Sequence, residues 1–390
     1  MVSAGQYSDN NCVTFITGGK HYFDHLLHLI GSAKETLHLQ TYIFEEDETG
    51  QMVTNALVAA VHRGVKVFLL VDGYASQGLS RKFIFKLKDE GINFKFFEPL
   101  FKSRKFYLGR RLHHKVCVSD LRYAMVGGIN VANHYNDLPD NPAWLDFAMG
   151  VEGDIVSELF VLCQKTWNGF QPLRKIPPLR NRPVFAIRKG DKSAVRMRRN
   201  DWVRRKQEIS RSYLEMFNNA SSHITLLSSY FLPGRVFRRA LKRARDRGVE
   251  VTVIVAGKSD VKISKYAERF MYEWMLVRGI KIIEYNKTVL HGKLAICDDE
   301  WITLGSFNVN DISTYASVEL NLDVKDTTLV REIRSEVESI LTGHTQAVDE
   351  NYVASHTSLL TRFLQWSAFM SIRILFYFFT FYFKQVEKTE

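Results

Sequence analysis

The sequence predicts an α/β protein built from two similar halves, and three observations support this fold class. One signature occurs twice, as LHHKVCVSD beginning at Leu112 and as LHGKLAICD beginning at Leu290, and a G-[GS]-x-N tetrapeptide follows each copy. The first glycine of the tetrapeptide lies 14 residues after the first histidine of each signature. Short runs of Val, Leu and Ile precede both copies and are typical of parallel strands covered on both faces.

The repeat extends well beyond the signature. Each half reads as strand, helix, strand, helix, strand and strand, with glycines that suit helix C-termini. This order favours an α/β sandwich in each half, and we expect a pseudo-two-fold axis to relate the two. The corresponding segments are the strands 35–44 and 222–231, the helices ending near Gly64 and Gly248, the strands beginning at Val65 and Val249, and the segments around Gly91 and Gly279.

The repeat also predicts the domain organisation. We expect an N-terminal half over residues 1–168 and a C-terminal half over 205–345, each carrying one copy of the signature. Between them, 169–204 contains four prolines and many basic residues, which indicates an exposed connector. This connector either touches an anionic partner or is simply solvated, and both interpretations stay open. Residues 346–390 form a separate tail.

Composition and charge restrict the class of partner. The 390 residues are 46% hydrophobic and carry a net charge of +11, so we expect a folded protein that binds nucleic acid, anionic lipid or a phosphorylated substrate. The four cysteines show no C-x-x-C spacing, so neither a zinc site nor a redox motif is indicated. The first residues lack the charged and apolar pattern of a secretory signal.

The tail contains a strongly aromatic segment over 363–383. Its 21 residues include one formal charge, Arg373. About 20 apolar residues span a bilayer core, but a charge near the centre costs about 3 kcal/mol on insertion scales. Aromatic residues favour the membrane interface, so we expect a membrane-associating helix that is embedded in or lies on the bilayer surface rather than crossing it. A full span and a buried core helix are the alternatives.

The histidine and lysine of each copy predict phosphodiester chemistry. Alternate residues of a strand share a face, so His113 projects with Lys115, and His291 projects with Lys293. Imidazole is both a nucleophile and a proton carrier near neutral pH. A lysine ammonium stabilises non-bridging phosphate oxygens. Brought together, one histidine would attack phosphorus and the other would protonate the leaving alkoxide, which is covalent catalysis in two steps.

Other motif residues complete the candidate site. Asn130 and Asn308 offer amide donors to the phosphate. Asp120 and Asp298 end their strands and are counted with the catalytic motif, although we expect them to form salt bridges rather than to carry protons. The extra His114 occupies the alternate position, so it faces the other side of the strand and is expected to be structural.

Each catalytic histidine also needs a hydrogen-bond acceptor that fixes its tautomer. Asp146 follows the first motif histidine by 33 residues and Glu319 follows the second by 28, and both stand on the next expected strand. These matching positions predict that each acid orients the histidine of its own copy.

With these motifs, the chain resembles the phospholipase D superfamily, whose members carry paired HKD motifs. The resemblance runs from about Thr14 to Val324 and is strongest to bacterial cardiolipin synthases of the shorter form, which lacks N-terminal membrane helices. It is carried by QTYIFEEDETG from Gln40, VDGYAS from Val71, RRLHHK and VGGIN, together with the aromatic tail.

The resemblance implies a phosphatidyltransferase. Phosphatidylglycerol would form a phosphatidyl-histidine on His113, His291 would act as acid and base, and the hydroxyl of a second phospholipid would complete the transfer. Asp146 and Glu319 would be the histidine-orienting acids, and no metal or cofactor is implied. Ser306 would give the phosphate a hydroxyl contact from one side only, because the first copy has Gly128 at that position.

The implied partners are phospholipid substrates and an anionic membrane surface, at the cytoplasmic face of the bacterial inner membrane, with lipid favoured over nucleic acid. The alternative function is a phosphodiesterase, either a lipid hydrolase or a nuclease, in which water replaces the alcohol at the same site. The second lipid, either phosphatidylglycerol or phosphatidylethanolamine, and the oligomeric state stay open.

Overall fold

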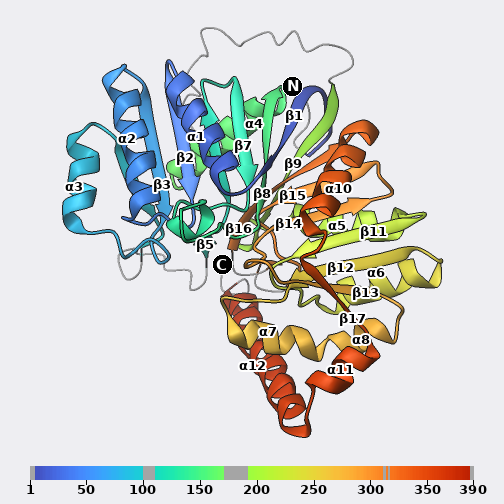
Figure 1. Cartoon of the computed structure of the whole chain (residues 1–390). Coiled ribbons are helices and arrows are strands. Elements are labelled where there is room, and N and C mark those ends of the chain that lie inside the picture. The colour runs from blue at the N-terminus through green and yellow to red at the C-terminus, as the bar shows by residue number, and fades with distance from the viewer. Residues whose placement is uncertain (1–4, 100–109, 171–191, 311–312, 315–316, 387–390) are drawn as a thin grey trace. The chain divides into compact units, whose positions relative to one another are not determined.

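The chain forms two compact units, which are described separately. The computed structural model describes residues 5–99, 110–170, 192–310, 313–314 and 317–386, with side chains described as far as 375 (Figure 1). Within these ranges, the first unit contains the residues up to Arg199 together with Thr303–Phe307 and Ser317–Asp326, and the second contains the remainder. Two segments that follow the second signature in the sequence therefore belong to the first unit.

The first unit is built on a mixed sheet in the strand order β4-β3-β2-β6-β7-β8-β1. Strands β2, β3 and β4 are parallel, whereas β6, β7, β8 and β1 pair antiparallel with their neighbours. The inner strands are almost wholly buried, as their runs of Val, Leu and Ile predict. Their bounds are β1 Ser8–Thr17, β2 Thr36–Thr41, β3 Lys66–Asp72, β4 Asn93–Phe97, β6 Lys115–Ser119, β7 Tyr123–Gly127 and β8 Phe147–Gly153.

Two short pairings bring distant segments of the chain into this unit. Strand β9 (Ser193–Asp201) pairs antiparallel with β1. Strand β5 (Arg111–Leu112) pairs in parallel with β16 (Ser317–Lys325). Strand β9 falls inside the range expected to be an exposed connector, and 171–191 of that range lies outside the described residues.

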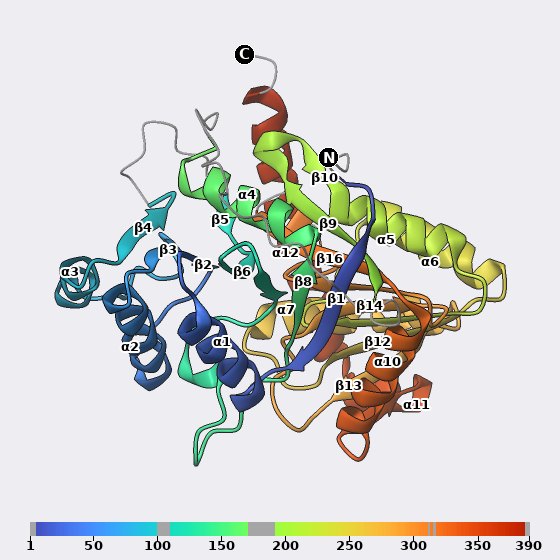
Figure 2. The same cartoon turned by 90° about the horizontal axis from the view of Figure 1, so that it is seen from above.

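Helices α1 and α2 cover one face of the first sheet, and α4 covers the other (Figure 2). Helix α2 begins after Asp47, whose carboxylate accepts the Gly50 N–H at 2.8 Å as an N-cap. Leu26, Val53 and Leu57 are fully buried in the hydrophobic core. The bounds are α1 Lys20–Ser32, α2 Glu48–His62, α3 Arg81–Asp89, α4 Ile155–Trp167 and the 3₁₀ turn η1 Asn133–Tyr135.

The second unit repeats the central part of the first. Its strands follow the order β14-β11-β12-β13-β17, in which β11, β12 and β13 are parallel and the two outer strands are antiparallel. The order β14-β11-β12-β13 corresponds to β6-β2-β3-β4, so the prediction of two similar α/β halves is confirmed. The bounds are β10 Lys206–Gln207, β11 His223–Ser228, β12 Glu250–Ala256, β13 Lys281–Tyr285, β14 Lys293–Cys297 and β17 Thr345–Val348. Strand β15 (Trp301–Gly305) begins in the second unit and ends in the first.

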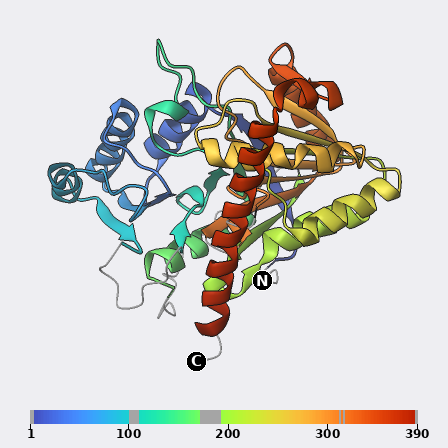
Figure 3. The same cartoon turned by 90° about the horizontal axis from the view of Figure 1, so that it is seen from below.

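The helices of the second unit end in a long C-terminal helix, α12, that lies across α7 (Figure 3). The rings of Phe270 in α7 and Phe369 in α12 are 5.0 Å apart. Across the residues that the structure describes, no helix combines the length and apolarity needed to cross a membrane. The bounds are α5 Glu208–Asn219, α6 Arg235–Asp246, α7 Lys262–Phe270, α8 Tyr272–Leu276, α10 Thr327–Leu341, α11 Glu350–His356, α12 Leu359–Val386 and the 3₁₀ turn η3 Trp202–Arg204.

The motif aspartate of the first copy binds backbone N–H groups and does not form the expected salt bridge. Asp120 follows β6 with a φ of 50°, in the left-handed region that Asp tolerates better than most residues. Its carboxylate accepts the backbone N–H groups of Lys34, Glu35 and Thr36 at 2.7–2.8 Å. The expectation of a strand-end salt bridge is therefore corrected, because the carboxylate binds the backbone that leads into β2.

The motif aspartate of the second copy makes the same contact. Asp298, with a φ of 52°, accepts the backbone N–H groups of Ser221, Ser222 and His223 at 2.7–2.9 Å. Burial alone would raise the pKa of this carboxyl, but the three backbone hydrogen bonds hold it well below its usual range. Both aspartates thus fix a motif hairpin to the start of the adjacent antiparallel strand, β2 or β11.

Replacing this aspartate should destabilise the protein. In Asp298→Ala, three backbone N–H groups lose their acceptor, which we expect to lower the free energy of unfolding by about 1–3 kcal/mol in urea denaturation at pH 7. Because the pKa is lowered in the folded state, the aspartate stabilises the fold above its unfolded pKa of about 3.9 and loses this effect as the pH falls further. The difference from the wild type should therefore shrink in acid.

The matched control for this measurement is Asp246→Ala. Asp246 is an exposed aspartate that pairs with Lys242 within α6. Such a surface pair contributes about 0.3–0.5 kcal/mol to the free energy of unfolding, so the control should be destabilised by no more than this. Equal unfolding midpoints for Asp298→Ala and the wild type would contradict the structural role.

Candidate active site

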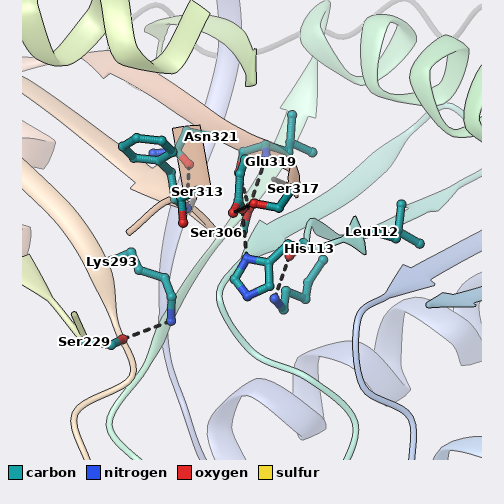
Figure 4. A network of polar contacts seen from close by, with 12 residues as sticks. Leu112, His113, Ser229, Lys293, Ser306, Ser313, Ser317, Glu319 and Asn321 are labelled. Carbon is teal, nitrogen blue, oxygen red and sulfur yellow. Dashed lines mark hydrogen bonds and ion pairs between the residues drawn. The ribbon is translucent and has the colours of Figure 1, made fainter. Parts of the chain in front are cut away.

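The first motif histidine lies where β5 ends and β6 begins. The backbone N–H groups of His113 and His114 both donate to the carbonyl of Val318, at 3.0 and 2.9 Å. The Nδ1–H of His113 donates to Oε2 of Glu319 at 2.9 Å (Figure 4). This hydrogen bond assigns the ring proton to Nδ1 and leaves the lone pair of Nε2 for chemistry. The His113 side chain keeps 18% of its surface exposed, whereas Glu319 is fully buried.

The buried carboxylate of Glu319 has three donors. Besides His113, the hydroxyls of Ser306 and Ser317 donate to its two oxygens, the latter at 2.7 Å (Figure 4). Burial raises the pKa of Glu319, but the neighbouring His113, Lys115 and Ser306 lower it more, so the net shift is downward. The group therefore stays ionised at neutral pH and stabilises positive charge on His113.

The pairing of acids with histidines differs from the sequence prediction. Glu319 was expected to orient His291, but the structure pairs it with His113. The reason is that β16, which carries Glu319, joins the first unit and runs parallel to β5. Asp146 accepts the Phe147 N–H at 2.7 Å and packs against Gly128, where any side chain would clash with its carboxylate. Glycine in the first copy thus makes room for Asp146.

The first motif lysine is held beside a tyrosine. Nζ of Lys115 donates to the His113 carbonyl at 2.6 Å and lies 5.3 Å from the centre of the Tyr42 ring. The same ring contacts His113 edge-on at 4.9 Å. Burial first, and Asp72 second, raise the pKa of Tyr42 to about 12, so its hydroxyl stays neutral at physiological pH. Tyr42 therefore borders both motif side chains, although the sequence prediction did not include it.

The second motif lysine is held by a serine instead. Nζ of Lys293 lies 3.2 Å from Oγ of Ser229 (Figure 4). It also lies 2.9 Å from Nδ1 of His291. Ser229 in turn donates to the His291 carbonyl at 2.7 Å. In the repeat, Ser229 occupies the position of Tyr42, one residue beyond the equivalent strand. Alignment of the two halves could have found both residues.

The motif asparagines have different environments. Nδ2 of Asn130 donates to the Tyr135 hydroxyl at 2.8 Å, and its Oδ1 accepts the Ile43 N–H at 3.1 Å. Its amide therefore braces the loop after β2. Asn308 is 4% exposed, and its Oδ1 is buried without a hydrogen-bond partner. The role of both asparagines toward phosphate remains a prediction.

The motif serine supports the acid rather than offering its hydroxyl proton to a phosphate. Ser306 is fully buried, and its Oγ donates to Glu319. The same oxygen accepts the backbone N–H of Leu320 at 3.1 Å. We therefore correct the expected phosphate contact of Ser306, because its one proton is used to hold Glu319. The difference between Gly128 and Ser306 follows from the distinct acids beside them.

A buried acid that the sequence prediction omitted positions the strand of His113. Asp72, at the end of β3, accepts the N–H of Leu112 at 2.8 Å through Oδ2. Its Oδ1 accepts the N–H groups of Tyr74 and Ala75 at 2.9 and 3.1 Å. An acid at the carboxyl end of a buried parallel strand is a signal that could have identified it, because such strand ends build sites.

A second omitted acid supports the loop of Ser229. Glu268 on α7 is 1% exposed, and its Oε2 accepts the Phe231 N–H at 3.0 Å. Its Oε1 lies 2.8 Å from Nζ of Lys265. Burial raises the pKa of Glu268, although Lys265 opposes this effect. The amphipathic pattern of α7 offers no signal that its single acid is buried.

The extra histidine is structural, as its alternate position predicted. Nε2 of His114 pairs with Oε1 of Gln40 at 2.9 Å, on the far side of the strand. Burial lowers its pKa to about 3, so the ring is neutral. Separately, the described ranges contain no group of three or more His, Cys, Asp and Glu side chains that could hold a metal ion.

Each of the two α/β units carries an H-x-K pair whose lysine begins the equivalent strand, β6 or β14. This repeat defines a phospholipase D-like enzyme. The family model described as "Cardiolipin synthase, PLD-like domain" matches residues 26–142 and 213–341. Cardiolipin synthase B of Shigella flexneri is 31% identical over 354 residues, which cover 90% of this chain and 85% of the relative. Cardiolipin synthase 1 of Staphylococcus aureus strain MRSA252 is 27% identical, over 90% of this chain and 72% of the relative. The chain belongs to the cardiolipin synthase family of phospholipase D-like proteins.

Solved structures agree with this fold. The phosphatidylserine synthase of Haemophilus influenzae Rd KW20 superposes with a TM-score of 0.70 over 95% of both chains, at 14% sequence identity. The polyphosphate kinase of Porphyromonas gingivalis reaches a TM-score of 0.59 over 87% of this chain and 49% of its own, at 17% identity. At such identities the similarity supports the architecture alone.

Loss of the Glu319 charge should impair turnover more than substrate binding. In Glu319→Gln, the Nδ1–H of His113 loses its anionic acceptor, and the positive charge that develops on the ring is no longer stabilised. We expect kcat to fall by about 100- to 10,000-fold with little change in KM, measured by steady-state kinetics on phosphatidylglycerol.

Ser317→Ala is the matched control, because it removes a donor to Glu319 but keeps the charge. We expect its kcat to stay within about tenfold of the wild type, since it loses one neutral hydrogen bond. A Glu319→Gln enzyme with more than a tenth of wild-type kcat would rule out the orienting role.

Proposed function

We propose that this enzyme transfers a phosphatidyl group from phosphatidylglycerol to the hydroxyl of a second phospholipid, which forms cardiolipin and releases glycerol. The observation that carries the proposal is His113, whose Nδ1 is bound to a buried, ionised glutamate in a member of the cardiolipin synthase family. With the proton on Nδ1, the Nε2 atom of His113 would be the one to attack phosphorus. The names of the relatives support phospholipid substrates.

In the first step, Nε2 of His113 attacks the phosphorus of phosphatidylglycerol and forms a P–N bond. The P–O bond to glycerol breaks, and His291 donates a proton to the leaving alkoxide. Glu319 stabilises the positive charge on the substituted imidazole through Nδ1–H. The products of this step are phosphatidyl-histidine and glycerol.

In the second step, His291 removes the proton from the hydroxyl of the second lipid. The resulting oxygen attacks phosphorus, the P–N bond breaks, and His113 is regenerated. Lys115 and Lys293 stabilise the negative non-bridging oxygens in both steps. One phosphodiester is exchanged for another, so the reaction uses no external energy source.

The two motifs have different assigned roles although their sequences are equivalent. One reaction needs a nucleophile and a separate proton donor, and each copy supplies one histidine. We assign the nucleophile to His113 because its tautomer leaves Nε2 unprotonated. By analogy within the repeat, we propose that Asp146, which immediately precedes β8, has the corresponding orienting role in the reaction.

We also propose that the enzyme works on an anionic membrane surface, at the cytoplasmic face of the bacterial inner membrane. The net charge of +11 favours attraction to anionic lipid. The exposed apolar side chains of α12, among them Leu360, Phe363 and Trp366, suit the interfacial region of a bilayer. Substrates confined to that surface would reach the site by lateral diffusion.

Removal of either motif histidine should abolish turnover by different routes. His113→Ala lacks the nucleophile and should form no covalent intermediate. His291→Ala should still accumulate phosphatidyl-histidine from labelled phosphatidylglycerol, although slowly, because protonation of the leaving group contributes about 100- to 10,000-fold.

The labelled intermediate can be followed by acid-resolved gel electrophoresis and peptide mapping. His28→Ala, at an exposed position on α1, serves as the control and should keep wild-type activity. Label found on His291 in the His113→Ala enzyme would reverse the assignment.

Product analysis tests the transfer itself. Vesicles of labelled phosphatidylglycerol should yield cardiolipin and glycerol in equal amounts, separated by thin-layer chromatography. Phosphatidic acid as the sole lipid product would show that water is the acceptor and that the enzyme is a hydrolase. Phosphatidylethanolamine added as a second lipid would show by its own product whether it competes as the acceptor.

A further inference from the structure

We propose that helix α7 acts together with α12 as a single lipid-docking surface of the second unit. We define the α7–α12 surface by its exposed apolar side chains. The inference rests on the proposed function, because it names the membrane contact through which the enzyme reaches its substrates. The members are Val261, Ile263, Tyr266, Leu359, Leu360, Phe363, Leu364, Trp366, Ile374 and Leu375.

Helix α7 carries an apolar stripe on its outer face. Ile263 is 50% exposed and Tyr266 is 40% exposed. Together with Phe270 they stand three and four residues apart, so they share one side of the helix. Phe270 contacts Phe369 of α12 at 5.0 Å. The stripe on α7 therefore leads directly to α12.

Helix α12 packs by a narrow face and leaves its wide apolar face uncovered. Gln365 and Ala368 are buried toward the unit, while Phe363 is 59% exposed and Trp366 is 46% exposed. An ion pair of 2.7 Å between Arg362 and Glu273 fixes the beginning of the helix next to α8. The helix is thus held along α7 (Figure 3). Its aromatic and aliphatic side chains named above are exposed.

The composition of this surface fits an anionic lipid bilayer better than another protein. A contiguous group of exposed large apolar residues marks an interaction site, whereas single exposed residues need no explanation. Tyr266 and Trp366 are the aromatic types that favour the membrane interface. Lys262 and Arg373 are exposed on the same two helices, and a positive charge beside an apolar face is the pattern of interfacial helices.

The inner face of α7 connects the surface to the second motif. Glu268 accepts the backbone N–H of Phe231, which lies two residues after Ser229. Ser229 contacts the ammonium of Lys293 and donates to the His291 carbonyl. The helix that we assign to lipid contact is thus the helix that supports the Lys293 loop, so docking brings this motif to the bilayer surface.

The test compares two double variants with matched chemistry. Ile263→Ser with Tyr266→Ser removes the stripe of α7 and leaves α12 intact. Phe85→Ser with Val236→Ser is the control, because these residues are 70% and 60% exposed on α3 and α6. Urea unfolding of both variants checks that each one folds.

Binding is measured by co-sedimentation with vesicles of phosphatidylglycerol and phosphatidylcholine. We expect the α7 variant to bind about tenfold more weakly, from the loss of two interfacial side chains. The control should bind like the wild type. Unchanged vesicle binding of the α7 variant would overturn the proposal. So would a monomer–dimer shift with unchanged vesicle binding, which would identify the surface as a contact between copies of the chain.

Activity on two forms of substrate separates this inference from the proposed function. On short-chain phosphatidylglycerol below its micelle concentration, the α7 variant should turn over like the wild type, because no surface is needed. On vesicles it should lose activity in proportion to binding. A wild type that is inactive on both forms would refute the proposed function alone, and the vesicle-binding comparison would still decide the role of α7.

Discussion

The hydrogen bond between Nδ1 of His113 and the carboxylate of Glu319 is the interaction on which the active site depends. A fully buried carboxylate costs several kcal/mol to desolvate, so it persists only with a full set of donors. His113, Ser306 and Ser317 provide those donors. This requirement explains why β16 belongs to the first unit and why the second motif has a serine where the first has a glycine.

The two motif lysines show how one sequence pattern is adapted to two environments. Lys115 lies over the Tyr42 ring, which attracts the charge without using any of its N–H donors. Lys293 donates a hydrogen bond to the hydroxyl of Ser229 and lies close to Nδ1 of His291. Equivalent positions in a repeat thus acquire unequal chemistry from one neighbouring side chain.

Local patterns predicted the repeated strands and helices of the two halves and the structural role of His114, because burial and strand alternation are properties of neighbouring residues. They missed β9, which lies in the segment expected to be a connector. Long-range pairing was not predictable in the same way. Nothing in the segment around Glu319 shows that its strand lies beside β5, so the acid was matched to the wrong histidine. Asp298 was misread for a similar reason. Its partners are the backbone N–H groups of 221–223. Nearly every residue has such a group, so a sequence pattern cannot identify which ones will bind the carboxylate.

In the proposed mechanism, the choice between an alcohol and water as acceptor is kinetic, because both would attack the same phosphatidyl-histidine. Transfer requires that the intermediate meets a lipid hydroxyl before it meets water. Two features of this chain act in that direction. Glu319 and Ser306, which lie behind the proposed nucleophile, are fully buried, so that side of His113 is shielded from bulk solvent. The exposed apolar residues of α12 favour the interfacial layer, where lipid hydroxyls are concentrated and bulk water is reduced. An enzyme held at that layer can therefore conserve the phosphodiester by supplying the acceptor at high local concentration rather than by chemical discrimination against water.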